Sequence, residues 1–226
     1  RHYENLKDEV LDIIKDEPEL LEGFEEKYKN RLKFLEDYQN IKYAEKFGDL
    51  VSYARKIDKN IGNGSQFSTA VLKNYFKLMA YKDEYEVSRL MTNKKFVDDV
   101  NKNFEGNFNY NFYLAPPIFS KKSKVDGKLL KIKFGGWLFN VFKLLSKLKF
   151  LRGTKLDPFG YLNERKKERE LIRDYKQTIT DIGIKINKSN YETAVKIASV
   201  PDQIRGFGHV KEKNIKEAIN YKTDLL

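Results

Sequence analysis

The sequence predicts a mainly α-helical domain with one small antiparallel β-hairpin inserted near the middle. Apolar residues recur every three or four positions through most of the chain, which is the period of an amphipathic helix. Two segments, residues 107–114 and 130–134, instead alternate apolar residues in steps of two, and Pro116-Pro117 follows the first while Gly135-Gly136 follows the second. With 40% hydrophobic residues, a chain of 226 residues can fill a sizeable core.

The first quarter of the chain is predicted to be helical, from Tyr3 to about Asn60, and Pro18 is expected to separate two helices. The apolar positions that recur at helical spacing are Leu6, Val10, Ile13, Ile14, Leu32, Leu35, Tyr38, Tyr43, Phe47, Leu50, Val51 and Ala54. Residues 61–65 follow with two glycines and an asparagine, which tolerate a positive φ angle. We therefore expect a turn there.

An apolar stripe resumes at Phe67 and predicts a helix that continues to about Met91. A shorter amphipathic helix is expected next, and it should end at Gly106 because glycine commonly terminates a helix. Asp83, Glu84 and Glu86 within this region form an acidic group. The sequence shows no partner carboxylate for proton transfer, so a solvated or interdomain salt-bridge role is the favoured interpretation, with Lys82 and Glu86 at i,i+4 pairing distance on a helix.

The alternating segments predict the hairpin. Phe108, Tyr110, Phe112 and Leu114 form one alternation, which Pro116-Pro117 ends, and Leu130, Ile132 and Phe134 form the other. The connection, residues 120–128, carries four lysines. After Gly135-Gly136 a helix is expected over residues 137–152, with an apolar face of Trp137, Leu138, Val141, Phe142, Leu145 and Leu148.

Three more helices are predicted in the C-terminal part. Asp157 is expected to cap a charged helix that starts with Pro158 and runs to about Ile182. Ser189 and Glu192 fit a capping box for a helix that ends at Val200. The last helix should contain Val210, Ile215, Ala218 and Ile219.

Charge is concentrated in one module of the chain. The formal net charge is +11, and residues 121–155 alone hold ten Lys and Arg152 against Asp126. This pattern favours a solvated or partner-facing patch over a membrane-surface or nucleic-acid site, which remain open alternatives. The candidate partner-binding residues are Lys121, Lys122, Lys124, Lys143, Lys147 and Arg152.

Composition excludes several kinds of site. The chain has no cysteine, so it can form no disulfide, no thiolate zinc site and no cysteine-ligated iron-sulfur cluster, and two histidines cannot make a strong metal site unaided. No apolar run approaches the roughly 20 residues that cross a bilayer. The chain is therefore expected to be soluble and cytoplasmic, and its start without Met suggests a fragment of a longer polypeptide.

The most unusual string covers residues 201–214, PDQIRGFGHVKEKN. It has two glycines of a dinucleotide-binding motif, but Lys211 stands where the third belongs, and the spacing also excludes a P-loop. One interpretation is a tight turn between helices. The other is an anion contact, in which Arg205, His209 and Lys211 flank a helix N-terminus that favours a phosphate or carboxylate.

Four long segments together resemble one family. They are NYFKLMAYKDEYEVSRL at residues 74–90, FYLAPP at 112–117, LRGTKLDPFG at 151–160 and IRGFGHVKEKN at 204–214. YQNIKYA at 38–44 and FGGW at 134–137 fit the same pattern in the same order. The chain from residue 22 onward resembles the C-terminal domain of the fused bacterial indolepyruvate ferredoxin oxidoreductases, whereas residues 1–21 match poorly and Gly136 stands where many members have Pro.

The resemblance implies a function for the complete enzyme. Such enzymes decarboxylate an aryl 2-oxoacid oxidatively with thiamine diphosphate, coenzyme A and iron-sulfur clusters, and deliver the electrons to ferredoxin. Because this chain lacks the cluster-ligating cysteines, the implied role of residues 22–226 is a helical accessory domain, without a catalytic residue, that packs on the catalytic domains of an oligomeric enzyme. The alternative is an independent module whose basic hairpin and helix bind an anionic partner such as ferredoxin; nucleic acid is not the expected partner.

Overall fold

The computed structural model describes residues 23–62, 64–103, 109–114, 130–206 and 208–226. Within these ranges the chain is helical apart from one two-stranded antiparallel hairpin, so the predicted fold class is confirmed. The elements are α2 (Phe24–Tyr38), α3 (Ile41–Ile61), α4 (Gln66–Met79), α5 (Glu84–Met91), α6 (Lys94–Asn103), β1 (Phe112–Leu114), β2 (Ile132–Phe134), α7 (Leu138–Lys147), η1 (Leu148–Leu151), α8 (Asn163–Lys185), α9 (Tyr191–Ser199), η2 (Val200–Gln203) and α10 (Gly208–Leu225).

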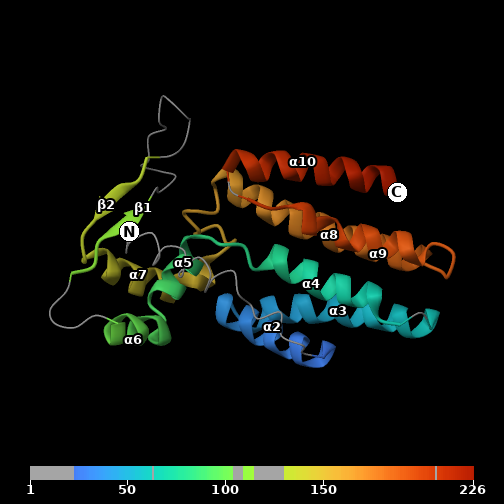
Figure 1. Cartoon of the computed structure of the whole chain (residues 1–226), viewed down its shortest axis with the longest axis horizontal. Helices are drawn as coiled ribbons and strands as arrows, with labels where there is room; N and C mark the ends of the chain where they lie inside the picture. The colour runs from blue at the N-terminus through green and yellow to red at the C-terminus, as the bar shows by residue number, and fades with distance from the viewer. Residues whose placement is uncertain (1–22, 63, 104–108, 115–129, 207) are drawn as a thin grey trace.

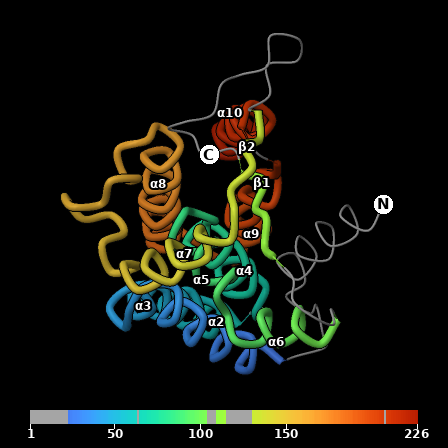
Figure 2. Tube along the Cα trace, turned by 90° about the vertical axis from the view of Figure 1, so that its left-hand side faces the viewer, coloured from blue at the N-terminus to red at the C-terminus, as the bar shows by residue number. Residues whose placement is uncertain are grey.

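The helices form an elongated stack with the hairpin at one end. Helix α4 lies at the centre and contacts α3, α8, α9 and η2, while α2 packs mainly on α3 and also contacts α4. Figure 1 shows α3, α4, α8 and α10 layered along the long axis, with α5, α6, α7 and the hairpin gathered at the end opposite α9. Viewed from that end in Figure 2, α2 and α3 lie on one side of α4 and α10 lies on the opposite side.

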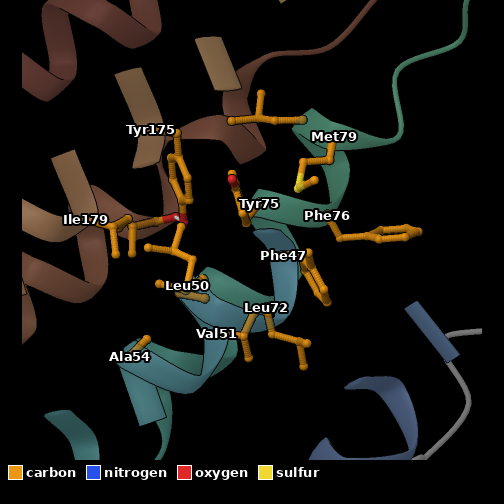
Figure 3. Packing of buried hydrophobic residues seen from close by; sticks show 14 of the residues in the cluster. Phe47, Leu50, Val51, Ala54, Leu72, Tyr75, Phe76, Met79, Tyr175 and Ile179 are labelled. Atoms are coloured by element: carbon orange, nitrogen blue, oxygen red, sulfur yellow. Dashed lines mark hydrogen bonds between the residues drawn. The ribbon is translucent and has the colours of Figure 1, made fainter. Parts of the chain in front are cut away.

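The core fills the space between α3, α4 and α8. Figure 3 shows the apolar faces of these three helices turned toward one another. Aromatic rings continue across all three, because Phe47 stacks on Tyr75 at 6.1 Å between centroids and Tyr75 stacks on Tyr175 at 5.8 Å. Burying side chains of this size stabilises the fold by roughly 1.5–3 kcal/mol each. The predicted apolar stripes of residues 35–54 and 67–80 supply most of this core.

A glycine lets α8 approach α3 closely. A Cβ atom at Gly183 would lie 2.5 Å from the Tyr53 hydroxyl and 2.7 Å from Ile57 Cδ1, so no larger residue fits without movement. The Tyr53 hydroxyl donates a hydrogen bond to the Thr180 carbonyl at 3.4 Å in the same contact. The absence of a side chain at this position therefore sets the distance between the two helices.

The hairpin is shorter than its alternating sequence predicts. Phe112 pairs with Phe134, and the strands hold three residues each. Aromatic contacts attach it to α7: Phe112 meets Phe142 edge to face at 5.2 Å, and Tyr110 stacks on Phe139 at 5.6 Å. The predicted lysine-rich connection, with Lys121, Lys122 and Lys124, lies outside the described residues. So do the helix predicted before Pro18 and the end, at Gly106, of the short helix predicted after Met91.

Two predicted helices are broken by capping side chains. The stretch predicted to be helical up to about Asn60 is interrupted where Asn40 accepts a hydrogen bond from the Tyr43 amide at 2.9 Å and starts α3. The helix predicted to run to Met91 ends at Met79, and a new helix, α5, starts after Asp83, which accepts from the Glu86 amide at 2.9 Å. The expected turn at residues 61–65 is present, with positive φ at Gly62 and Gly64.

Two other predicted helix starts are wrong. Asp157 does not cap α8, which begins at Asn163, because its carboxylate instead accepts from the amides of Gly153 and Phe159 and from the Tyr85 hydroxyl. Residues 157–162 therefore form turns.

The capping box at Ser189 is also absent. The Ser189 hydroxyl donates to Asn187 Oδ1 at 2.6 Å, and Asn190 occupies the N-cap position of α9 without a side-chain capping bond. The Asn190 side chain accepts instead from the Asn187 amide at 2.7 Å, so local asparagine turns replace the predicted cap.

Replacing Gly183 by Ala should reveal the close contact between α8 and α3. Alanine favours a helix by about 1 kcal/mol over glycine, but the new methyl group collides with Tyr53 and Ile57, which costs roughly 1–3 kcal/mol. We expect the free energy of unfolding in urea to fall by about 1 kcal/mol. Lys176→Ala, at an exposed position of α8, should change it little. A Gly183→Ala protein more stable than the parent would contradict the contact.

Candidate functional site

The string at residues 201–214 forms the passage from η2 into α10. Gly206 and Gly208 adopt φ angles of 89° and 55°, which side-chain-bearing residues rarely adopt. A Cβ atom at Gly206 would also lie 2.8 Å from Val210 Cγ1. The interpretation of these glycines as a tight turn is therefore confirmed.

The three candidate anion contacts do not form a free cationic cluster. The Arg205 Nε atom donates to the Asp202 carbonyl at 3.0 Å, and Lys211 Nζ lies 2.5 Å from Glu168 Oε1. His209 lies exposed in the first turn of α10. Two of the three are thus held by protein groups, and an anion contact at this site stays a prediction.

Lys77 joins this region, although no sequence pattern indicates it. Its Nζ atom donates to the Pro201 carbonyl at 2.8 Å. Burial lowers the pKa of Lys77, the nearby Asp202 raises it, and the charges of Arg205 and Lys211 lower it further. Only the fold brings Lys77 of α4 next to residues more than 120 positions away, which no spacing pattern could show.

The six candidate partner-binding residues differ in where they lie. Lys143 and Lys147 lie exposed on α7, in keeping with a partner-facing role, whereas Lys121, Lys122 and Lys124 fall outside the described residues. The prediction that Arg152 contacts an external partner is wrong, because its side chain is buried, with 3% of the residue exposed. Its charge is compensated inside the protein, where the prediction had placed it in a solvent-facing patch.

Arg152 forms a buried ion pair with Asp83. Arg152 Nε lies 2.5 Å from Asp83 Oδ2, and Nη2 lies 2.8 Å from Oδ1, in the bidentate geometry that is strongest for these groups. Nη1 donates to the Tyr38 carbonyl, and the guanidinium lies 3.6 Å from the centre of the Tyr38 ring. Burial opposes the charged form of Arg152, but the hydrogen bonds and charge of Asp83 outweigh it and raise the pKa of Arg152.

The other two acids of α5 also pair with arginines. Glu86 binds Arg89 through two bonds of 2.8 Å, and Glu84 lies 3.3 Å from Arg165 of α8. We call these three pairs the α5 acid cluster: Asp83–Arg152, Glu84–Arg165 and Glu86–Arg89. The three acids do form salt bridges, as predicted, but the solvated or interdomain setting is wrong: Asp83 and Glu86 are buried within the domain, and Glu86 pairs with Arg89. Carboxylates held in this way serve to position elements, because their oxygens already accept from guanidinium groups.

Tyrosines and Asp157 surround the α5 acid cluster. The Tyr85 hydroxyl donates to Asp157 Oδ1 at 3.1 Å, and the Tyr38 hydroxyl donates to the Tyr81 carbonyl at 2.7 Å. Burial raises the pKa of Tyr81 to about 12 and raises the pKa of Tyr85, with Asp157 adding to the latter effect. These hydroxyls remain neutral donors over the physiological range of pH.

Another buried carboxylate, that of Asp58, closes the start of α4. Asp58 is 3% exposed, and it accepts from the Ser68 amide at 2.8 Å and from the Tyr191 hydroxyl at 2.7 Å. The Tyr191 hydroxyl in turn accepts from the Phe67 amide at 3.1 Å. The amides that a helix leaves unsatisfied at its N-terminus are thus taken by protein groups here.

Hollows in the described part of the chain include the following two. One has a volume of about 40 Å³ and lies between α4, α8, η2 and α10, lined mainly by apolar residues such as Leu78 and Ile204. The other, of about 440 Å³, is an open depression beside the turn from α3 to α4, lined by Arg55, Lys56 and Ser65 among others. The first is far smaller than the roughly 300–1,000 Å³ of small-molecule sites.

Metal-ligating side chains do not gather in the ranges that the structure describes: no group of three or more His, Asp or Glu residues is placed to hold an ion there. Among the same residues no helix is both long and apolar enough to cross a membrane.

Replacing Arg152 by Ala should destabilise the protein strongly. The change leaves the Asp83 carboxylate buried without its partner, and breaking a buried pair in this way costs about 3–5 kcal/mol. Arg152→Lys keeps the charge but loses the bidentate geometry, so its cost should be intermediate. Lys147→Ala is the exposed control, with an expected change within about 0.5 kcal/mol. Urea unfolding measures all three, and equal stabilities of the Arg152 and Lys147 variants would contradict the buried pair.

Alkaline pH should unfold the protein together with tyrosine ionisation. Burial raises the pKa of seven tyrosines, namely Tyr38, Tyr43, Tyr75, Tyr81, Tyr85, Tyr175 and Tyr191. Each contributes stability that is fully present below the unfolded value of about 10 and is lost as the pH rises toward the folded value. The lowered pKa values of Lys77 and Lys149 act in the opposite sense, but they are two groups against seven.

We therefore expect the helical circular dichroism to fall between about pH 10 and 12 as tyrosinate absorbance rises. Complete tyrosinate formation with the helical signal intact would contradict the burial of these rings.

Comparison with known proteins places the chain in a family without assigning an activity. A family model described as a family of unknown function, DUF6537, matches residues 24–221. Searches of curated proteins and of solved structures give no match. The matched range covers α2 through most of α10, which includes the α5 acid cluster and the turn at Gly206. The protein therefore belongs to the DUF6537 family.

Proposed function

We propose that this chain is a non-catalytic C-terminal accessory domain of an indolepyruvate:ferredoxin oxidoreductase that depends on thiamine diphosphate and iron-sulfur clusters. In this proposal residues 22–226 pack on the catalytic domains of the same cytoplasmic, oligomeric enzyme. The resemblance of residues 38–44, 74–90, 112–117, 134–137, 151–160 and 204–214 to that family suggests the role. The structural observation that supports it is that several of these segments meet at the α5 acid cluster.

The α5 acid cluster draws most of its residues from segments that carry the resemblance. Asp83 and Arg89 lie in residues 74–90, Arg152 in residues 151–160, and Tyr38 in residues 38–44. Residues 112–117 contribute Phe112, which packs on α7. These side chains serve the fold, so the resemblance is one of scaffold. A scaffold without free acids or nucleophiles at its centre suits an accessory domain.

In this proposal the cofactors of the complete enzyme are bound outside this chain. Iron-sulfur clusters need cysteine ligands, and the chain has none. Of the two hollows described above, the one of about 40 Å³ is far smaller than small-molecule sites, and the one of about 440 Å³ is an open surface depression. In the proposal the iron-sulfur clusters and thiamine diphosphate are bound by the other domains.

The proposal is tested by purifying the complete native protein through an affinity tag at its own C-terminus. We expect this chain in complex with, or continuous with, a polypeptide that contains thiamine diphosphate, iron and acid-labile sulfide. The preparation should reduce ferredoxin when indolepyruvate and coenzyme A are supplied, and the 226-residue chain alone should not. A native preparation without these cofactors and without 2-oxoacid-dependent ferredoxin reduction would overturn the proposal.

A further inference from the structure

The outer face of α7 and η1 exposes large apolar side chains next to lysines. Trp137 and Leu144 are each 60% exposed and Phe150 is 55% exposed. Trp137 and Leu144 are seven residues apart, which is about two helical turns, and Lys143, Lys147 and Phe150 are exposed on the same segment. We call these five residues the α7 outer face. The opposite side of α7 is buried through Leu138 and Phe142, so the exposed residues are not needed for the core.

The α7 outer face is positively charged without compensation from its own segment. No Asp or Glu occurs from residue 127 to residue 156, which contains seven Lys and Arg152. Within the described part of the chain, neither Lys143 nor Lys147 forms an ion pair with a carboxylate. Exposed aromatic and aliphatic groups among lysines call for an occupant that is both apolar and acidic.

The chain itself contains a segment with this chemistry. Residues 1–22 hold eight acidic residues against Arg1, Lys7 and Lys15, a net charge of −5. Their sequence also places Leu6, Val10, Ile13 and Ile14 at helical spacing, so one side of a helix would be apolar with acids beside it. Of the segments outside the described ranges, this one is strongly acidic, whereas residues 115–129 are basic.

The segment is also long enough to reach. It joins the described chain at Gly23, just before α2, and the far end of α2 lies against η1, where Lys149 Nζ donates to the Asp37 carbonyl. Helix α2 has 15 residues, so it spans about 22 Å at roughly 1.5 Å per residue. Twenty-two residues cover about 33 Å as a helix and about 73 Å when extended. The segment can therefore turn back along α2 to α7.

We propose that residues 1–22 dock on the α7 outer face of the same chain. Their acidic side chains face Lys143 and Lys147, and their apolar side contacts Trp137, Leu144 and Phe150. Attachment through α2 gives an effective concentration of order millimolar, so even a weak contact is largely formed. The docked segment covers the surface that would otherwise be offered to other acidic proteins. This inference does not depend on the proposed function.

Two features of the composition make a direct test possible. Trp137 is the single tryptophan of the chain, and the absence of cysteine allows a label at one introduced site. A nitroxide, which quenches tryptophan fluorescence at short range, is attached to Asn5→Cys in the full chain. The control carries it on Lys59→Cys, an exposed site in the last turn of α3. Because α3 has 21 residues, this site is about 30 Å from the end of α3 that lies near Arg152.

The proposal predicts that the Asn5 label lowers Trp137 fluorescence at least about twofold relative to the Lys59 label, since more than half of the molecules are docked. The quenching should not depend on protein concentration and should weaken as salt is added. Lys143→Glu with Lys147→Glu should abolish it, whereas the matched reversals Lys176→Glu and Lys185→Glu on α8 should not. Circular dichroism confirms that each variant is folded.

Equal quenching by the Asn5 and Lys59 labels would overturn the proposal. So would quenching that rises with protein concentration, because the segment would then bind a second copy. A final experiment adds vesicles that contain phosphatidylserine. If Trp137 emission then shifts and the Asn5 label does not quench it, the α7 outer face binds a membrane surface and the proposal is wrong.

Discussion

The buried guanidinium of Arg152 is the constraint on which the arrangement of this domain depends. It follows η1, binds the carboxylate that caps α5, and donates to the carbonyl at the end of α2. These three elements come from distant parts of the sequence, and the ion pair alone joins residues 69 positions apart. A charge in this position is costly unless every donor finds an acceptor. The geometry of the junction between the helical stack and the hairpin end is therefore closely specified.

The α5 acid cluster extends the same constraint to α8. Asp83 at the cap of α5 and Glu84 in its first turn pair with arginines from other segments, Arg152 and Arg165, whereas Glu86 pairs with Arg89 of the same helix. The Glu84–Arg165 pair attaches α5 to α8, and Arg89 also lies over the Phe34 ring of α2 at 5.1 Å. Such buried pairs add specificity more than net stability. The apolar core between α3, α4 and α8 supplies the main stabilising free energy.

Periodicity was sufficient to predict the fold class and much of the core, because residues such as Phe47, Val51 and Tyr75 follow the helical repeat. It failed where a single side chain decides a boundary. Asp83 lies in a run with uninterrupted helical spacing, and its capping role depends on the break after Met79. Asp157 preceded a proline in a typical cap pattern, but its oxygens are taken by Tyr85 and local amides. Arg152 lies among lysines in the sequence and was therefore predicted to belong to a surface patch. Its partner Asp83 is 69 positions away, so no local pattern indicates the ion pair.

At the candidate site, too, local backbone could be predicted from the sequence and long-range contacts could not. The two glycines at 206 and 208 have the backbone that their sequence predicted, whereas the ion pair of Lys211 with Glu168 depends on the packing of α10 against α8. The unusual strings of this chain therefore specify a scaffold: a turn, a cap and a buried pair. Its exposed chemistry lies elsewhere, on the lysines and apolar side chains of α7.

The most direct measurement is a double-mutant cycle on Arg152 and Asp83. The free energies of unfolding of Arg152→Leu, Asp83→Leu and the double variant are compared with that of the parent protein. If the buried pair fixes the junction, the double variant should be more stable than the sum of the two single losses implies, with a coupling of about 2–3 kcal/mol. Additive losses, within about 0.5 kcal/mol, would show that the two residues act independently and would contradict the account.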